Sequence, residues 1–120
     1  MKPHKNLEAW KLSFEFVKEI YKVTALFPSE EKFGLVSQLR RAAVSVPTNI
    51  AEGAARRSKK EFIQFLYIAE GSISELDTLV ELSAELDFLT KETSNILFIF
   101  LEDISKRIIG LIKSLESRLN

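Results

Sequence analysis

The spacing of the apolar residues limits the fold most, because they recur every three or four positions along the whole chain. This spacing places them on one face of an α-helix and does not fit the alternation of a β-strand. Four glycines and three prolines among 120 residues leave little material for turns, which favours a few long helices. A chain of this length forms one domain around one core. The sequence therefore predicts a single all-α domain over residues 1–120.

Capping residues and a helix breaker divide the apolar pattern into four helices. Asn6 is a candidate N-cap for the first helix, and Pro28 should end it. Ser58 and Glu61 match the S-x-x-E capping box at the start of the third helix. Thr90 is a candidate cap for the fourth helix. The predicted helices cover about residues 7–27, 30–57, 59–88 and 91–118.

Long helices with short connections favour an antiparallel up-down-up-down four-helix bundle. The apolar residues of the first helix span roughly 220° of its circumference, although one core needs only about 100°. In the fourth helix, residues 96–101 are apolar on every side. These two helices are neighbours in this topology, so we expect their spare apolar surface to pool into one outward patch. Such patches usually mark interfaces, so we expect a homo-oligomer.

Composition excludes several kinds of site. Cysteine is absent, which removes disulfides, thiolate nucleophiles and thiolate metal ligands. The one histidine, His4, precedes the predicted helices, so neither a catalytic triad nor a di-iron centre is indicated. We expect no enzymatic activity, no cofactor and no metal. No segment approaches the about 18 apolar residues that span a bilayer, and the N-terminus lacks the apolar core of a signal peptide. We therefore expect a cytoplasmic protein without a membrane contact.

A polar stripe runs along the second helix beside its apolar face. Its members fall within roughly 80° of one another on a helix of 3.6 residues per turn, so they can point into a groove between helices. They form either a structural polar seam or a ligand or partner site. Pro47 lies in this helix, where we expect a kink, and Asn49 could satisfy the carbonyl that the proline leaves unpaired. The stripe consists of Gln38, Arg41, Ser45, Asn49 and Glu52, with Gln64, Ser72 and Glu75 as candidate partners on the third helix.

Charge is unevenly divided in a chain that is neutral overall. Residues 1–60 hold 12 basic and 6 acidic side chains, whereas residues 61–120 hold 5 basic and 11 acidic ones. The two halves therefore carry net charges of +6 and −6. A neutral protein should not coat nucleic acid indiscriminately, but one with opposite halves can present a local basic face. Alternatively, the two halves pair with each other inside the fold.

The most concentrated basic segment lies between the second and third helices. Arg56 and Arg57 close the second helix, where the helix dipole favours cations, but Lys59 and Lys60 occupy the first turn of the third helix, where it disfavours them. A bound phosphate would offset the unfavourable interaction of these two lysines with the helix dipole. Alternatively, nearby glutamates could neutralise the corner. No aromatic residue is interleaved, so a nucleic-acid contact here would be to backbone phosphate without base stacking. The candidate anion or nucleic-acid contacts are Arg40, Arg41, Arg56, Arg57, Lys59 and Lys60.

Residues 27–76 resemble the 23S rRNA intervening-sequence protein family of small bacterial four-helix bundles, most specifically in SQLRRAAVSVPTNIAEG. LEAW and EIY upstream and ISKRIIGLIKSL downstream are also similar to it. The resemblance implies a ring, commonly a pentamer, and no established enzymatic activity. Similar proteins are accessory subunits of diversity-generating retroelements, where a basic pentameric barrel binds a reverse transcriptase and nucleic acid.

This chain differs from the basic retroelement proteins because it is neutral, with a pI near 6.6. In a ring, its basic residues would still be repeated around one axis. Two functions stay open at this point. One is a non-catalytic, oligomeric accessory protein associated with RNA, and the other is a protein–protein adaptor without nucleic-acid binding.

Overall fold

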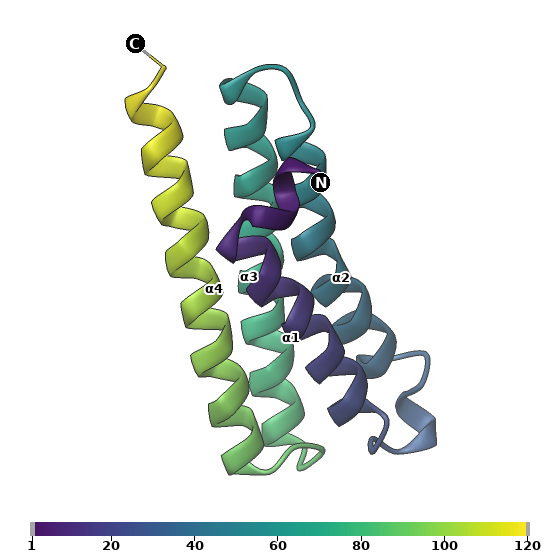
Figure 1. Cartoon of the computed structure of the whole chain (residues 1–120). Coiled ribbons are helices and arrows are strands. Elements are labelled where there is room, and N and C mark those ends of the chain that lie inside the picture. Colours follow the sequence, from purple (N-terminus) through teal and green to yellow (C-terminus); the bar gives the residue numbers. More distant parts are fainter. Residues whose placement is uncertain (1, 120) are drawn as a thin grey trace.

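The computed structural model describes residues 2–119 and, within them, contains helices and no strand. The all-α, four-helix prediction is confirmed. The chain reverses direction at each connection between successive long helices (Figure 1). Two short 3₁₀ helices, η1 (Pro3–Asn6) and η2 (Ser29–Glu31), precede the first and second long helices. The long helices are α1 (Glu8–Thr24), α2 (Leu35–Ala54), α3 (Lys59–Glu85) and α4 (Lys91–Ser117).

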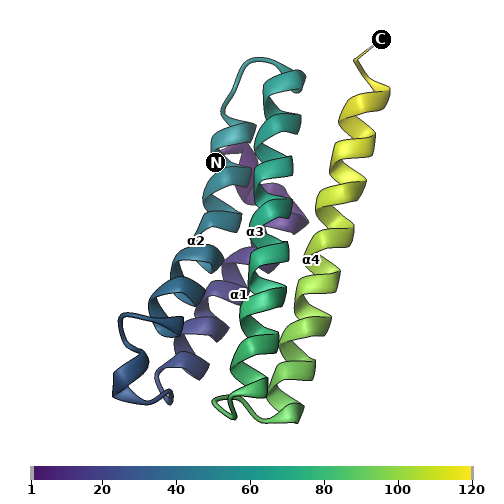
Figure 2. The same ribbon diagram turned by 180° about the vertical axis from the view of Figure 1, so that it is seen from behind.

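The four helices pack around one elongated core, and the molecule measures 49 × 21 × 21 Å. α1 packs against α2 and α4, and α3 packs against the same two helices. Seen from behind, α3 lies between α2 and α4 (Figure 2). The rings of Phe16 on α1 and Phe100 on α4 meet edge to face, with centroids 5.2 Å apart. The most deeply buried large side chains come from all four helices and include Phe16, Ile20, Leu39, Ile50, Leu66, Leu76, Leu97, Ile104 and Ile108.

The first two helices are shorter than the sequence predicts. Asn6 belongs to η1 and not to a cap, since α1 begins after Leu7 without a side-chain cap. α1 ends at Thr24, one turn before Pro28. α2 begins at Leu35 because the preceding Gly34 has a non-helical backbone, with φ −109° and ψ −112°. These boundaries depend on backbone turns that cannot be predicted from the spacing of apolar residues.

The last two helices begin where the sequence predicts. The hydroxyl of Ser58 accepts a hydrogen bond from the Glu61 N–H at 3.0 Å, and Thr90 caps α4 in the same way. α3 ends at Glu85, three residues earlier than expected, because Asp87 adopts a left-handed backbone with φ 64°. The N–H of Phe88 then donates to the Ser83 carbonyl at 2.9 Å, which closes the helix as in a Schellman motif.

The spare apolar surface is arranged differently from the predicted single patch. On α1 it turns toward α2, where Trp10, Phe14 and Val17 line an apolar groove of about 310 Å³. On α4, Ile96 and Ile99 are 52% and 62% exposed. The α1 surface therefore does not join that of α4, because Trp10, Phe14 and Val17 lie in the groove beside α2. None of the helices within residues 2–119 is both long and apolar enough to cross a membrane.

Candidate functional site

The corner between α2 and α3 presents four exposed cations, Arg56, Arg57, Lys59 and Lys60. We call these four residues the basic corner. Within residues 2–119, the salt bridges are both between neighbouring side chains of α1, and none involves the basic corner. The sequence left open the alternative that nearby glutamates, Glu52 and Glu61, neutralise the corner. No ion pair within residues 2–119 supports this alternative. The four positive charges face solvent.

A close approach between α2 and α3 fixes the position of the basic corner. Gly53 is buried, and a Cβ added there would lie 2.8 Å from both Phe62 Cδ1 and Phe65 Cβ. The guanidinium of Arg56 lies over the Phe65 ring, 4.9 Å from its centroid. An aromatic side chain is therefore present at the corner, although none is interleaved in the local sequence. It was missed because α3 brings Phe65 back beside Arg56 from nine positions later in the chain.

Two residues of the predicted polar stripe of α2, Ser45 and Asn49, form a short polar seam in the structure. The Ser45 hydroxyl lies 2.7 Å from the Ser72 hydroxyl on α3, so these two side chains link the helices. Asn49 donates to the Ser45 carbonyl at 2.8 Å and to its hydroxyl at 3.0 Å. It does not bond the carbonyl of Ala43, which Pro47 leaves without its helical donor, so that interpretation of Asn49 was wrong. α2 nevertheless continues across Pro47 to Ala54.

The remaining three stripe residues, Gln38, Arg41 and Glu52, do not belong to this seam. All three are exposed, and their side chains form no hydrogen bond within residues 2–119. Of the candidate partners on α3, Ser72 contacts the stripe through Ser45. The stripe therefore does not form one continuous ligand groove.

Arg40 and Arg41 lie far from the basic corner. The fifteen or so residues between them and the corner correspond to about 22 Å at the 1.5 Å rise of an α-helix. Arg40 is held against α1, since its Nε donates to Thr24 Oγ1 at 3.0 Å and its Nη2 to the Tyr21 carbonyl at 3.4 Å. Its guanidinium also lies over the Tyr21 ring, 4.4 Å from the centroid. The six candidate contact residues therefore form two separate clusters.

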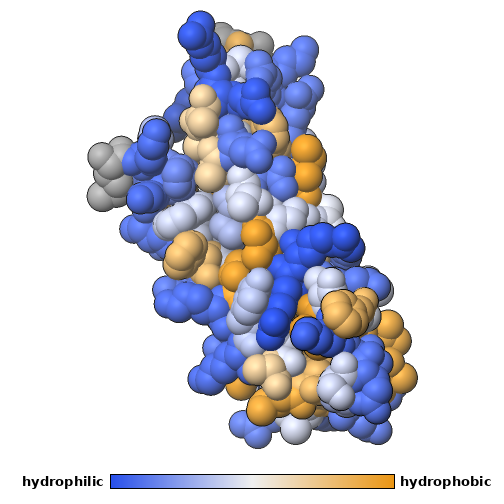
Figure 3. Space-filling view, turned by 90° about the vertical axis from the view of Figure 1, so that its right-hand side faces the viewer, coloured by the Kyte–Doolittle hydropathy of each residue, from blue (hydrophilic) through white to orange (hydrophobic). Residues whose placement is uncertain are grey.

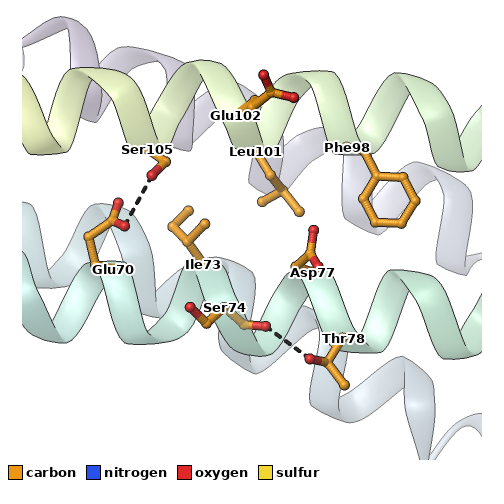
Figure 4. Close-up of a pocket in the computed structure, with 9 residues that line it drawn as sticks. All are labelled: Glu70, Ile73, Ser74, Asp77, Thr78, Phe98, Leu101, Glu102 and Ser105. Atoms are coloured by element: carbon orange, nitrogen blue, oxygen red, sulfur yellow. Dashed lines mark hydrogen bonds between the residues drawn. The ribbon is translucent and has the colours of Figure 1, made fainter.

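An acidic cavity of about 500 Å³ lies between α3 and α4 (Figure 4). Glu70 points from α3 toward α4, where the Ser105 hydroxyl donates to its Oε2 at 3.0 Å. Its other oxygen, Oε1, is buried and has no hydrogen-bond partner among residues 2–119. Burial raises the pKa of Glu70, against the opposing effect of the Ser105 hydrogen bond. Asp77 and Glu102 also line the cavity.

This cavity could not be predicted from the sequence, because its carboxylates look like ordinary surface residues of two different helices. Within residues 2–119, no group of three or more His, Asp or Glu side chains is placed to hold a metal ion. The cavity therefore supplies a titrating carboxyl group but no metal centre.

Comparisons with known proteins agree with the fold. No curated protein matches the chain. A similar crystal structure is that of a protein of unknown function from the S23 ribosomal protein family of Bacteroides thetaiotaomicron. Its TM-score is 0.81 at 27% identity, and the match covers 88% of this chain and 95% of that one. The family model described as 23S rRNA-intervening sequence protein matches residues 5–110, which include both clusters of basic residues. The chain therefore belongs to the 23S rRNA-intervening sequence protein family.

Proposed function

We propose that this protein is a non-catalytic, oligomeric accessory protein of the cytoplasm that associates with RNA or another nucleic acid through the basic corner. The observation that carries the proposal is the pair Lys59 and Lys60 in the first turn of α3, which are exposed and form no salt bridge with any residue of the described range 2–119. The positive end of the helix dipole makes this position unfavourable for cations unless an anion binds there.

The local backbone supports a phosphate contact at the same place. The first N–H groups of an α-helix have no partner inside the helix and point outward from its start. Ser58 accepts one of them, from Glu61. A phosphate placed at this end would interact with the remaining donors and with the side chains of Lys59, Lys60 and Arg57.

The exposed apolar side chains support assembly into a ring, for which we propose five copies. Phe14 remains 47% exposed in the groove between α1 and α2, and Ile99 is 62% exposed on the outer face of α4. The opposite net charges of the two halves of the chain also favour contact between different faces of neighbouring copies. A ring would repeat the basic corner around one axis and raise the local positive potential of a neutral subunit.

The nucleic-acid contact is tested by changing Arg56, Arg57, Lys59 and Lys60 together to alanine. We expect a large loss of affinity for an rRNA fragment in a filter-binding assay. The matched control changes four exposed cations of α4 and its C-cap to alanine. It removes the same numbers of arginines and lysines and should bind nearly as the wild type does. Equal losses in both variants would refute a specific role of the basic corner. The control residues are Lys106, Arg107, Lys113 and Arg118.

The proposed ring is tested by light scattering at micromolar concentration. We expect a mass of several subunits for the wild type and a lower mass for a variant in which both Ile96 and Ile99 are changed to serine. A monomeric wild-type protein would refute the assembly.

One observation favours a protein–protein adaptor as a second candidate function. The groove between α1 and α2 is lined almost wholly by apolar atoms of residues that include Trp10, Phe14 and Pro47, which fits the apolar face of a partner protein. An adaptor would retain a co-purifying protein after nuclease treatment and would show no salt-dependent RNA binding.

A further inference from the structure

A second groove, of about 480 Å³, lies along the first half of α2, between Tyr21 of α1 and the segment that precedes α2. We call it the aromatic groove. Two aromatic side chains, Tyr21 and Phe33, and three cations, Lys32, Arg40 and Arg41, line it. Its lining contains no carboxylate. Apolar and strongly hydrophilic side chains lie next to one another on this side of the molecule (Figure 3).

The two rings are available to a ligand. Phe33 is 89% exposed and Tyr21 is 45% exposed. Arg40 lies over one face of the Tyr21 ring and is itself held by Thr24. The Tyr21 ring is therefore fixed in place before any ligand binds, which reduces the ordering cost of binding.

The charges around the rings favour an anionic ligand. Lys32 lies 5.6 Å from the centroid of the Phe33 ring, and Arg41 is exposed without a salt bridge within residues 2–119. The neighbouring Glu31 does not line the groove, and its Oε1 accepts the Leu35 N–H at 3.4 Å. An acidic peptide would use the cations without needing exposed rings, and an apolar partner would need no cations. A single strand of nucleic acid uses both, through its phosphates and the faces of its bases.

We propose that the aromatic groove binds single-stranded nucleic acid, with unpaired bases stacked on Phe33 and Tyr21 and the adjoining phosphates on Lys32 and Arg41. This inference rests on the proposed function and adds the class of ligand. A duplex keeps its bases stacked within the helix, so these rings should favour an unpaired strand. The basic corner, about 22 Å away along α2, would contact the phosphates of either form.

The test compares three fluorescent RNA ligands of equal length by anisotropy: a single strand, the same strand with abasic sites, and a duplex. We expect the wild type to bind the normal single strand about tenfold more tightly than the abasic one, because stacking on aromatic side chains contributes at this scale for each base. The Phe33→Ala variant should lose most of this preference, and Phe33→Trp should keep it. Phe33 is almost fully exposed, so its removal should leave the fold intact.

The matched control is Leu26→Ala, because Leu26 is 86% exposed in the same region but does not line the aromatic groove. Equal binding of normal and abasic strands, or equal effects of Phe33→Ala and Leu26→Ala, would overturn the inference and leave the proposed function standing. The absence of binding to all three ligands would overturn both. A change in oligomer mass in Phe33→Ala, without a change in the preference for bases, would assign the groove to a subunit contact and refute the inference.

Discussion

Substitution of Gly53 by alanine tests the close approach that places the basic corner. The added Cβ would lie 2.8 Å from Phe62 Cδ1 and from Phe65 Cβ, and 3.3 Å from the Phe62 carbonyl oxygen. Two of these atoms belong to or adjoin the α3 backbone, so rotation of one side chain cannot relieve the contact. Overpacking of this kind costs about 1–3 kcal/mol. The higher helix propensity of alanine returns up to about 1 kcal/mol. We expect Gly53→Ala to lower the free energy of unfolding by about 1–2 kcal/mol.

The matched control is Gly71→Ala, because Gly71 is exposed within α3 and a Cβ there would meet nothing within 4 Å. It should raise the free energy of unfolding by about 0.5–1 kcal/mol through helix propensity alone. Urea unfolding followed by circular dichroism at a fixed protein concentration measures both changes. If the two variants are stabilised equally, α2 and α3 do not approach at Gly53 as described.

Three further predictions concern stability. Because burial raises the pKa of Glu70, the folded chain keeps this proton to a higher pH than the unfolded chain does. The contribution of Glu70 to the free energy of unfolding is therefore complete below its pKa in the unfolded chain and is lost as pH rises through its pKa in the folded chain. Glu70→Gln should flatten the fall in urea midpoint over this range, and an unchanged pH profile would contradict the assignment. Ser58→Ala should cost about 1 kcal/mol by removing the α3 cap, and a neutral effect in urea unfolding would refute that role. Phe16→Ala should cost about 3–5 kcal/mol, because Phe16 is 1% exposed. Phe100 is only partly buried, so calorimetry should show less than half this loss of stability for Phe100→Ala. Equal losses in the two variants would contradict the described packing.

The sequence predicted the four helices because their signals are local. Ser58 and Thr90 mark helix starts through chemistry that involves only the next few residues. Turn geometry was harder to predict from the sequence. The left-handed backbone of Asp87, for example, occurs at a residue type that does not require it. Gly53 and Gly71, which both lie within helices, show the same limit. An added Cβ would contact α3 at Gly53 but would meet nothing within 4 Å at Gly71, because such contacts depend on which face of a helix meets its neighbour.

The candidate contact residues were only partly predictable for a related reason. The basic corner could be predicted because its cations are close together in the sequence, and it is exposed and free of salt bridges within the part of the chain that the structure describes. The aromatic groove depends on a contact between Arg40 and Tyr21, nineteen positions apart and on different helices. No periodicity within one helix reveals such a pair. The partly buried carboxyl of Glu70 likewise depends on Ser105 of the next helix.

The most direct test of the central claim is the salt dependence of RNA binding by the wild-type protein. Four phosphate contacts in the basic corner predict that log K falls with log salt concentration with a slope of about −3 or steeper for a single strand. The variant with all four corner cations changed to alanine should show a slope shallower by up to about 3. A wild-type slope near zero, or the same slope in both proteins, would contradict the account.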